Sequence, residues 1–176
     1  MTPPILVTAR LELRPPLASD ILHSLAIATD AATGRFLGPH ISPAEHFLRF
    51  SRSAGSWFLY GYGVFVIRPI GADEVIGTCG IFHSWRDLGP DFDDQPEAGW
   101  MLCRDQHGRG LAHEAMSAVL DWFDRTHGLR RIGCMIDPGN APSIRLAEKL
   151  GFEAMRQASM PDGDTVRLFA RGSGVR

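Results

Sequence analysis

The sequence has no long apolar run and no concentration of basic residues. No stretch approaches the roughly 20 apolar residues that a membrane-spanning helix needs, and the opening MTPPILVTAR has neither a basic leader nor an apolar core. Lysines and arginines number 18 against 20 aspartates and glutamates, so the net charge of −2 provides no polybasic surface. We therefore expect a cytoplasmic protein whose main partner is neither a membrane nor a nucleic acid.

Cysteine is also scarce. The three cysteines, Cys79, Cys103 and Cys134, are odd in number and lack the spacing of metal ligands. Each falls in a stretch with the composition of a strand, which predicts buried, reduced thiols. The sequence therefore predicts no metal site.

Nothing divides the chain into parts. It has no repeat, no low-complexity segment and no long linker rich in serine, glycine and proline. A hydrophobic content of 44% supplies a sizeable core for 176 residues. The sequence therefore predicts one domain over residues 1–176, as a monomer or a homodimer.

Two helices are expected early in the chain. The segment LELRP, residues 11–15, alternates like a strand, and Ser19 or Asp20 then offers an N-cap for a first helix. SPAE, residues 42–45, is a capping box with proline at the first helical position. It predicts a second helix that runs through residues 46–52.

The middle of the chain changes to strand composition. Segments rich in β-branched and aromatic residues alternate with turn-rich stretches, which predicts an antiparallel meander. These segments are residues 57–69, 74–85 and 97–104.

The last third alternates helix and strand. Apolar residues recur at helical spacing from Leu111 until Gly128, and a strand follows at 130–136. Asn140 then reads as the N-cap of another helix, and residues 164–170 as a closing strand. Strands and helices together predict a mixed α+β fold.

The segment QHGRGLAHEAM, residues 106–116, joins the end of a strand to the start of the long helix. Free N–H groups at a helix N-terminus attract a diphosphate, and glycines let the backbone approach it. A dinucleotide fingerprint would need glycine where His113 stands, and the Gly-Lys-Ser/Thr of a P-loop is absent. A plain strand-to-helix turn remains the alternative for this segment alone.

Several motifs in order resemble the GNAT superfamily of N-acetyltransferases, specifically its RimJ/RimL-like branch. They are TARLELRP, GYGVFVI, EVIGTCGI, EAGWML, HGRGLAHEAM and IDPGNAPSIRLAEKLGF, and they cover nearly the whole chain. The resemblance implies a GNAT-type fold, with a central, mostly antiparallel twisted sheet flanked by helices. It also implies transfer of an acetyl group from acetyl-CoA to a primary amine by direct attack in a ternary complex.

The resemblance also implies which residues bind acetyl-CoA. The family's Gln/Arg-x-x-Gly-x-Gly/Ala loop maps onto residues 107–112, where histidine replaces the first Gln or Arg. Asn140 and Ser143 match its Asn-x-x-Ser, although both also fit ordinary helix capping. The expected cofactor-binding residues are Met101, Leu102, Cys103, His107, Gly108, Arg109, Gly110, Leu111, Ala112, Asn140 and Ser143.

Two residues are expected to be catalytic. Glu97 stands where some family members carry a general base for the amine, with a solvated strand glutamate or an arginine partner as the alternatives. The family's usual tyrosine proton donor is replaced by Ala147. Ser143, a water molecule or no donor at all then serves the departing thiolate, whose pKa near 8.5 makes it a fair leaving group.

The acceptor amine, a peptide N-terminus or a small molecule, is the least constrained part of the prediction. Aromatic residues that could line its pocket are Trp57, Tyr60, Tyr62, Trp85 and Trp100, with the core as their alternative location. The acidic loop at 91–97 slightly favours a cationic acceptor. A catalytically silent acyl-CoA-binding module and a nucleotide-binding protein remain competing interpretations.

Overall fold

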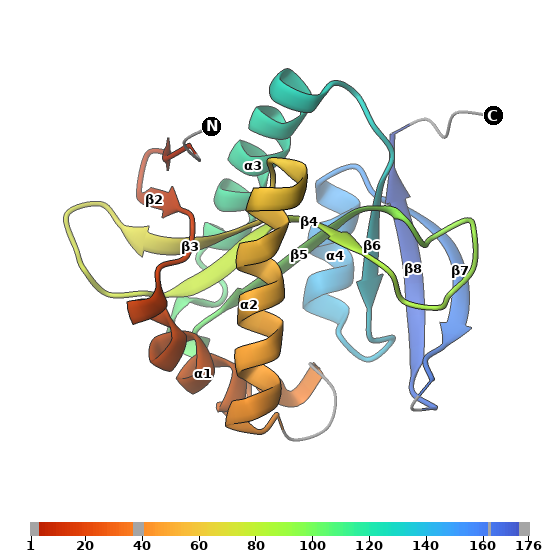
Figure 1. Ribbon diagram of the computed structural model, residues 1–176, viewed down its shortest axis with the longest axis horizontal. Helices are drawn as coiled ribbons and strands as arrows, with labels where there is room; N and C mark the ends of the chain where they lie inside the picture. The colour runs from red at the N-terminus through yellow and green to blue at the C-terminus, as the bar shows by residue number, and fades with distance from the viewer. Residues whose placement is uncertain (1–3, 37–40, 162, 173–176) are drawn as a thin grey trace.

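The computed structural model describes residues 4–36, 41–161 and 163–172, and its centre is one sheet. Within these residues the sheet has eight strands in the order β1-β2-β3-β4-β5-β6-β8-β7 (Figure 1). Neighbouring strands are antiparallel except for the parallel pair β5 and β6. In chain order the strands are β1 (Leu6–Val7), β2 (Leu11–Arg14), β3 (Val64–Pro69), β4 (Gly77–Ser84), β5 (Gln95–Leu102), β6 (Ile132–Ile136), β7 (Glu153–Ser159) and β8 (Thr165–Arg171).

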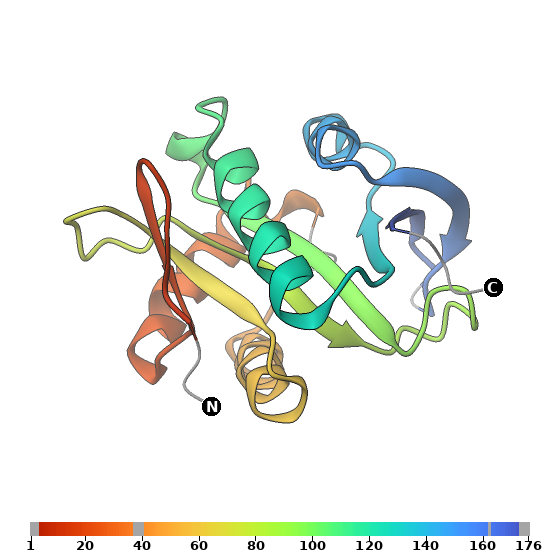
Figure 2. The ribbon, with the colours of Figure 1, turned by 90° about the horizontal axis from the view of Figure 1, so that it is seen from above.

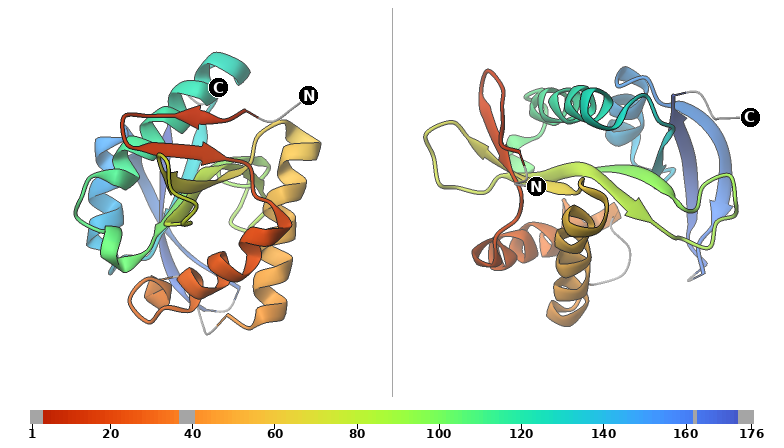
Figure 3. Two further views of the ribbon diagram at one scale, coloured as in Figure 1. Left: turned by 90° about the vertical axis from the view of Figure 1, so that its left-hand side faces the viewer. Right: turned by 45° about the horizontal axis from the view of Figure 1, so that its top comes forward.

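Helices cover both faces of the sheet. Helices α1 (Ile21–Thr29) and α2 (Pro43–Tyr60) lie on one face, and α3 (Leu111–His127) and α4 (Ala141–Lys149) lie on the other (Figure 2). The right-hand view of Figure 3 shows the same three layers. Short 3₁₀ turns lie at Ala18–Asp20, Gly34–Phe36 and Arg104–Gln106. The mixed α+β fold with a mostly antiparallel sheet, expected from the sequence, is confirmed.

The main core lies between the sheet and α3. Met116, Val119 and Phe123 of α3 are fully buried against strand residues such as Phe65 and Ile81. Their spacing along α3 is the helical periodicity of the sequence, and it ends at Gly128 as predicted. Burial of this stripe anchors α3 on the sheet and sets the position of its N-terminus.

Helix α2 is longer than predicted. Ser42 and Glu45 form the expected capping box, in which Ser42 Oγ accepts from the Glu45 N–H. The helix continues to Tyr60 and ends at Gly61, so the expectation that residues 57–60 begin a strand is wrong. No proline lies between Ser53 and Tyr60, and packing of Trp57 against Phe65 and Trp122 favours continuation of the helix despite Gly55.

Three further expectations need correction. Asp20 is the N-cap residue of α1, one of the two candidates, but its side chain does not cap the helix, because its carboxylate accepts both Arg14 Nη groups at 2.7 Å and the Leu17 N–H. Strand β7 was not predicted, since its sequence EAMRQAS lacks strand composition and depends on pairing with β8. Cys79 and Cys134 are buried free thiols, whereas Cys103 lies in a turn and is only half-buried.

Candidate active site

The sheet opens between its two parallel strands. The pairing of β5 with β6 is restricted to Glu97 with Gly133 and Ala98 with Cys134. Beyond Ala98 the strands diverge: in Figure 1, β4 and β5 run diagonally whereas β6 and β8 run nearly vertically. The backbone of β5 from Gly99 to Leu102 therefore has no strand partner on that side.

The N-termini of two helices lie at this opening. Parallel strands end at the same edge of a sheet, so the helices that come after β5 and β6 in the chain begin there. Strand β5 leads through Cys103 and the turn Arg104–Gln106 into α3, and β6 leads through residues 137–140 into α4. Residues 101–112 and 140–143, which are distant in sequence, are thereby brought to one edge. This edge contains every residue that the sequence analysis assigned to acetyl-CoA binding.

The glycine loop leaves the start of α3 uncapped. Gly108 and Gly110 have φ of 73° and 75°, a conformation that glycine adopts without strain. Gly110 is the N-cap, and no side chain of the described residues caps the helix there. A Cβ on Gly108 would meet nothing within 4 Å. The first N–H groups of α3, including those of Leu111 and Ala112, are therefore open to an anionic ligand.

An arginine that sequence reasoning missed holds this loop. Arg10 Nη1 donates to the Arg109 carbonyl at 3.1 Å, and Arg10 Nε donates to Glu114 Oε2 at 2.7 Å. Thr8 Oγ1 donates to Glu114 Oε1 at 2.6 Å. Burial alone would raise the pKa of Glu114, but these hydrogen bonds lower it. No local pattern could reveal this cluster, because Arg10 and Glu114 are 104 positions apart.

Hydrogen bonds hold two side chains of the loop, one to the preceding strand and one to the preceding turn. His107 Nε2 donates to the Leu102 carbonyl at 2.9 Å, since a carbonyl oxygen can only accept. Arg109 Nη1 donates to Gln106 Oε1 at 2.6 Å and remains exposed. The histidine that departs from the family's motif thus ties the loop to β5.

At the other side of the opening, Asn140 and Ser143 begin α4. Asn140 Oδ1 accepts from the Ser143 N–H at 3.2 Å, which confirms Asn140 as the N-cap. Trp100 Nε1 donates to Ser143 Oγ at 3.3 Å, so this contact spans the two arms of the opening. Trp100 is therefore a neighbour of Ser143 and not part of a pocket beside α2.

Glu97 is buried and paired. Its Oε1 and Oε2 accept from Arg86 Nη2 at 2.8 Å and Arg86 Nε at 2.9 Å, and its side chain is 5% exposed. Burial alone would lower the pKa of Arg86, but Glu97 and Asp93 raise it above its ordinary value. Of the alternatives stated for Glu97, the solvated strand glutamate is wrong and the arginine partner is confirmed.

Glu97 and Ser143 lie on opposite faces of the sheet. Glu97 is paired across the sheet with Phe82, which lines a cavity together with Arg52 of α2. Trp100, three residues further along β5, points to the other face, where it meets Ser143. At the opening between β5 and β6, beyond Ala98, no paired strands separate the two faces of the sheet among the described residues.

A cavity of about 160 Å³ lies next to Arg86 and Phe82, the neighbours of Glu97, and we call it the cavity beside Glu97, although Glu97 does not line it. It is lined by Arg52, Phe82, His83, Ser84, Trp85 and Arg86. A second cavity of about 120 Å³ lies between α1, α2 and strands β3 and β4. Both hollows lie on the α1 and α2 face, which is the Glu97 side of the sheet.

The acidic loop does not offer free carboxylates. Asp91 pairs with Arg156 at 2.7 Å, and Asp94 lies 2.9 Å from His83 Nε2. Asp93 accepts three backbone N–H groups of its own loop, and Glu97 is held by Arg86. The slight preference for a cationic acceptor, inferred from this loop, therefore loses its basis.

Most of the aromatic residues considered for an acceptor pocket are structural. Trp57 donates to the Val64 carbonyl inside the core, Tyr62 is buried, and Tyr60 stacks on His83. Only Trp85, which is 68% exposed, lines the cavity beside Glu97. At the position of the family's tyrosine, Ala147 is fully buried and carries no proton to donate.

The described residues contain neither a metal-binding cluster nor a membrane-spanning helix. Among these residues, no three or more histidine, cysteine, aspartate and glutamate side chains gather as a metal site would require. None of the helices in the described part of the chain combines the length and the apolarity needed to cross a membrane.

Comparisons with known sequences agree with this geometry. The model of the acetyltransferase (GNAT) domain matches residues 10–153. The N-acetyltransferase p20 of Bacillus licheniformis is 37% identical over 81 residues, which are 46% of this chain and 43% of that protein. An L-methionine sulfoximine/L-methionine sulfone acetyltransferase of Pseudomonas aeruginosa is 33% identical over 97 residues, 55% of this chain and 54% of that protein. The matched part of this chain spans about half the length of these curated relatives.

Solved structures are similar over nearly the whole length. A GNAT-family acetyltransferase from Bordetella pertussis has a TM-score of 0.84 and 32% identity, covering 96% of this chain and 99% of that one. RimL, a ribosomal L7/L12 alpha-N-protein acetyltransferase, has a TM-score of 0.74 at 18% identity, with 97% and 94% covered, and shows the shared fold alone. With its opened sheet, its uncapped glycine loop and a family match over most of its length, the chain belongs to the GNAT family of acetyltransferases.

Proposed function

We propose that this protein is an acetyl-CoA-dependent N-acetyltransferase of the RimJ/RimL-like branch, built as one domain over residues 1–176. It transfers the acetyl group to a primary amine, a peptide N-terminus or a small molecule, by direct attack in a ternary complex. The observation that carries the proposal is the opening between β5 and β6, which ends at the uncapped N-terminus of α3. Acetyl-CoA supplies the acetyl thioester that the amine attacks.

The donor side is assigned to one edge of the sheet. The N–H groups of residues 108–112 donate to the diphosphate at the positive end of the α3 dipole, with His107 and Arg109 beside them. Met101, Leu102 and Cys103 are assigned to the pantetheine arm, because β5 has no strand partner on the β6 side among the described residues at this end. Asn140 and Ser143 complete the opposite arm, with Ser143 as the proton donor nearest to the thiolate.

Glu97 is assigned as general base on the acceptor side, acting through a water molecule. Its two oxygens are held by Arg86, but each carboxylate oxygen has a second lone pair. The Arg86 guanidinium orients the carboxylate. An α-amine, with a pKa of about 7.7 to 8.0, needs such help less than a lysine at about 10.4.

The bidentate Arg86 pair also favours a second candidate, a silent acyl-CoA-binding module on the same fold. A buried carboxylate with two hydrogen bonds from one arginine can have a purely structural role. The two candidates differ in the release of free CoA thiol when the protein and acetyl-CoA meet a panel of peptide N-termini, polyamines, aminoglycosides and amino acids. Release with any amine supports the enzyme, and binding without release supports the silent module.

CoA is expected to raise the melting temperature, because the diphosphate binds the folded loop. At a concentration 100 times its Kd, a ligand stabilises by about 2.7 kcal/mol, which for a chain of this size raises Tm by about 5 to 10 °C. Pantetheine without the diphosphate should have little effect, whereas 3′-dephospho-CoA, which keeps the diphosphate, should act nearly as CoA does. Scanning calorimetry measures this, and equal stabilisation by pantetheine would contradict the loop assignment. Stabilisation by ATP or NAD and not by CoA would instead indicate a nucleotide-binding protein.

A further inference from the structure

Two arginines line the cavity beside Glu97, and one of them forms no ion pair among the described residues. Arg86 is neutralised by Glu97, but Arg52 forms no ion pair with any carboxylate of residues 4–36, 41–161 and 163–172. Arg14 and Arg171, by contrast, each pair with an aspartate. Arg52 is thus a cation at a cavity wall without an ion-pair partner among the described residues.

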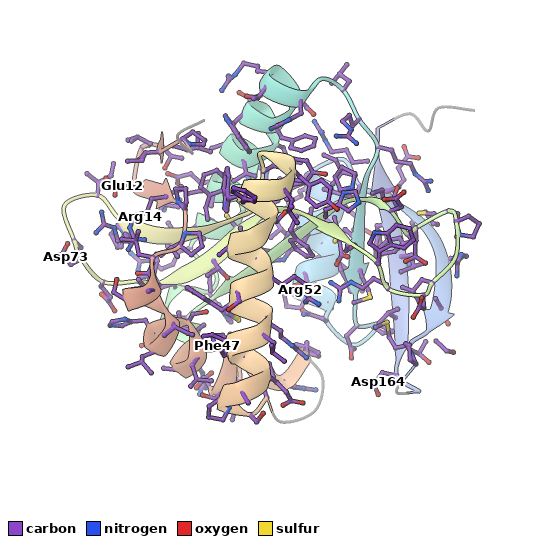
Figure 4. The ribbon with its side chains drawn as sticks, viewed as in Figure 1. Glu12, Arg14, Phe47, Arg52, Asp73 and Asp164 are labelled. Atoms are coloured by element: carbon purple, nitrogen blue, oxygen red, sulfur yellow. The ribbon has the colours of Figure 1, made fainter. Side chains whose placement is uncertain are left out.

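The surroundings of Arg52 add to this imbalance. Arg52 is exposed by area, yet burial is the largest of the causes that lower its pKa, followed by the guanidinium groups of Arg86 and Arg49, while the charge of Glu97 opposes them. Gathering like charges at one place costs free energy unless an anion is bound there. In Figure 4, Arg52 lies on the side of α2 toward α4, whereas Phe47 lies on the side toward α1.

A second polar group of the same cavity lacks a partner. Ser84 is 8% exposed, and its Oγ has no hydrogen-bond partner among the described residues. Buried hydroxyl groups are almost always hydrogen-bonded, so Ser84 Oγ is available to a water molecule or a ligand in the cavity. The hydroxyl can donate, as the arginine does, and both groups therefore favour an acceptor of hydrogen bonds.

The shape of the cavity restricts the ligand further. Its volume of about 160 Å³ is well below the roughly 300 to 1,000 Å³ of sites that enclose drug-sized ligands. Phe82 and the exposed ring of Trp85 form its apolar wall. It fits one small polar group with an apolar neighbour better than a polycation such as a polyamine or an aminoglycoside.

We propose that the acceptor is a free amino acid, whose carboxylate binds Arg52 and the Ser84 hydroxyl and whose amine is directed toward Glu97. The planar guanidinium matches a carboxylate through two parallel hydrogen bonds. This inference rests on the acetyltransferase function and names its substrate class. It replaces the cationic preference that the paired acidic loop no longer supports.

The test compares the twenty L-amino acids with their α-amides and the corresponding decarboxylated amines. Release of CoA from acetyl-CoA is measured, together with the melting temperature of the CoA-saturated protein in the presence of each compound. For the preferred side chain, the acid should exceed its amide by about 10- to 100-fold in kcat/KM, because hydrogen bonds to a charged group contribute about 1.5 to 3 kcal/mol.

Variants of Arg52 test whether this side chain binds the carboxylate of the amino acid. Arg52→Gln should raise the KM for the amino acid by about 10- to 100-fold, with the Kd for acetyl-CoA unchanged. Arg52→Lys should restore part of the affinity, because lysine keeps the positive charge. The restoration should be incomplete, because an ammonium group cannot form the two parallel hydrogen bonds of a guanidinium. Arg125→Gln, which removes an exposed arginine of α3, is the matched control and should change neither constant.

The two measurements separate the two proposals. If no amine releases CoA, the acetyltransferase function fails, while stabilisation by an amino acid that Arg52→Gln abolishes still supports the carboxylate site. Amides or polyamines that match the acids, an unchanged KM in Arg52→Gln, or the absence of any response to amino acids in both measurements would overturn the inference.

Discussion

Replacing Gly110 by glutamate is expected to abolish acetyl-CoA binding while the fold survives. Gly110 is the N-cap of α3, and apart from its chain neighbours the only atom of the described residues within 4 Å of a Cβ there is Arg10 Nη2 at 3.8 Å. The new carboxylate would have room, and the helix dipole would attract it to the place assigned to the diphosphate. Competition and charge repulsion should raise the Kd by a factor on the order of 100 or more. Isothermal titration with acetyl-CoA measures it.

The backbone at Gly110 requires a matched control. Its φ of 75° disfavours every other residue, so any substitution carries a cost of about 1 to 2 kcal/mol. Gly110→Gln has the same strain, length and volume without the charge, so the difference between the two variants reports the carboxylate alone. Acetyl-CoA affinity that is equal in Gly110→Glu and Gly110→Gln would show that the diphosphate binds elsewhere.

Glu97→Gln is expected to reduce turnover near neutral pH by about 10² to 10⁴, the usual contribution of a positioned base. Glutamine keeps the shape and one oxygen for Arg86 but cannot take up a proton. Affinity for acetyl-CoA should stay nearly unchanged, because Glu97 lies on the face of the sheet away from Ser143. Steady-state kinetics with the acceptor found in the amine panel measure the loss.

The pH dependence distinguishes a base from a structural glutamate. Above the pKa of the acceptor amine, much of the amine is already neutral, so the defect of Glu97→Gln should shrink as the pH rises. A defect that is constant with pH would mean that Glu97 only positions Arg86. Full activity across the range would mean that solvent deprotonates the amine.

Loss of the ion pair itself must be separated from loss of the base. Removing one partner of a buried pair costs about 3 to 5 kcal/mol because it leaves a charge unpaired, so the melting temperature of Glu97→Gln should be recorded with saturating CoA. Asp91→Asn is the matched control: it neutralises another arginine-paired carboxylate of the same loop, Asp91 with Arg156, far from the assigned chemistry. It should leave turnover unchanged.

Local signals in the sequence determined the elements that frame the donor side. The capping box at Ser42, the helical stripe from Leu111 to Gly128 and the N-cap at Asn140 all depend on residues three or four positions apart. Such interactions form within one element, so their spacing is visible in the chain. The glycine loop belongs to the same class, because positive φ is a property of single residues.

Family resemblance selected Glu97, but only the tertiary structure decided its surroundings. Arg86 and Glu97 are brought together by the register of β4 and β5, and Arg52 reaches their cavity from α2. The carboxylates of the acidic loop, whose sequence suggested attraction of a cation, have arginine, histidine and backbone partners, among them Arg156 and His83. Charges act through distances in space, and the sequence contains those distances only between neighbours along the chain.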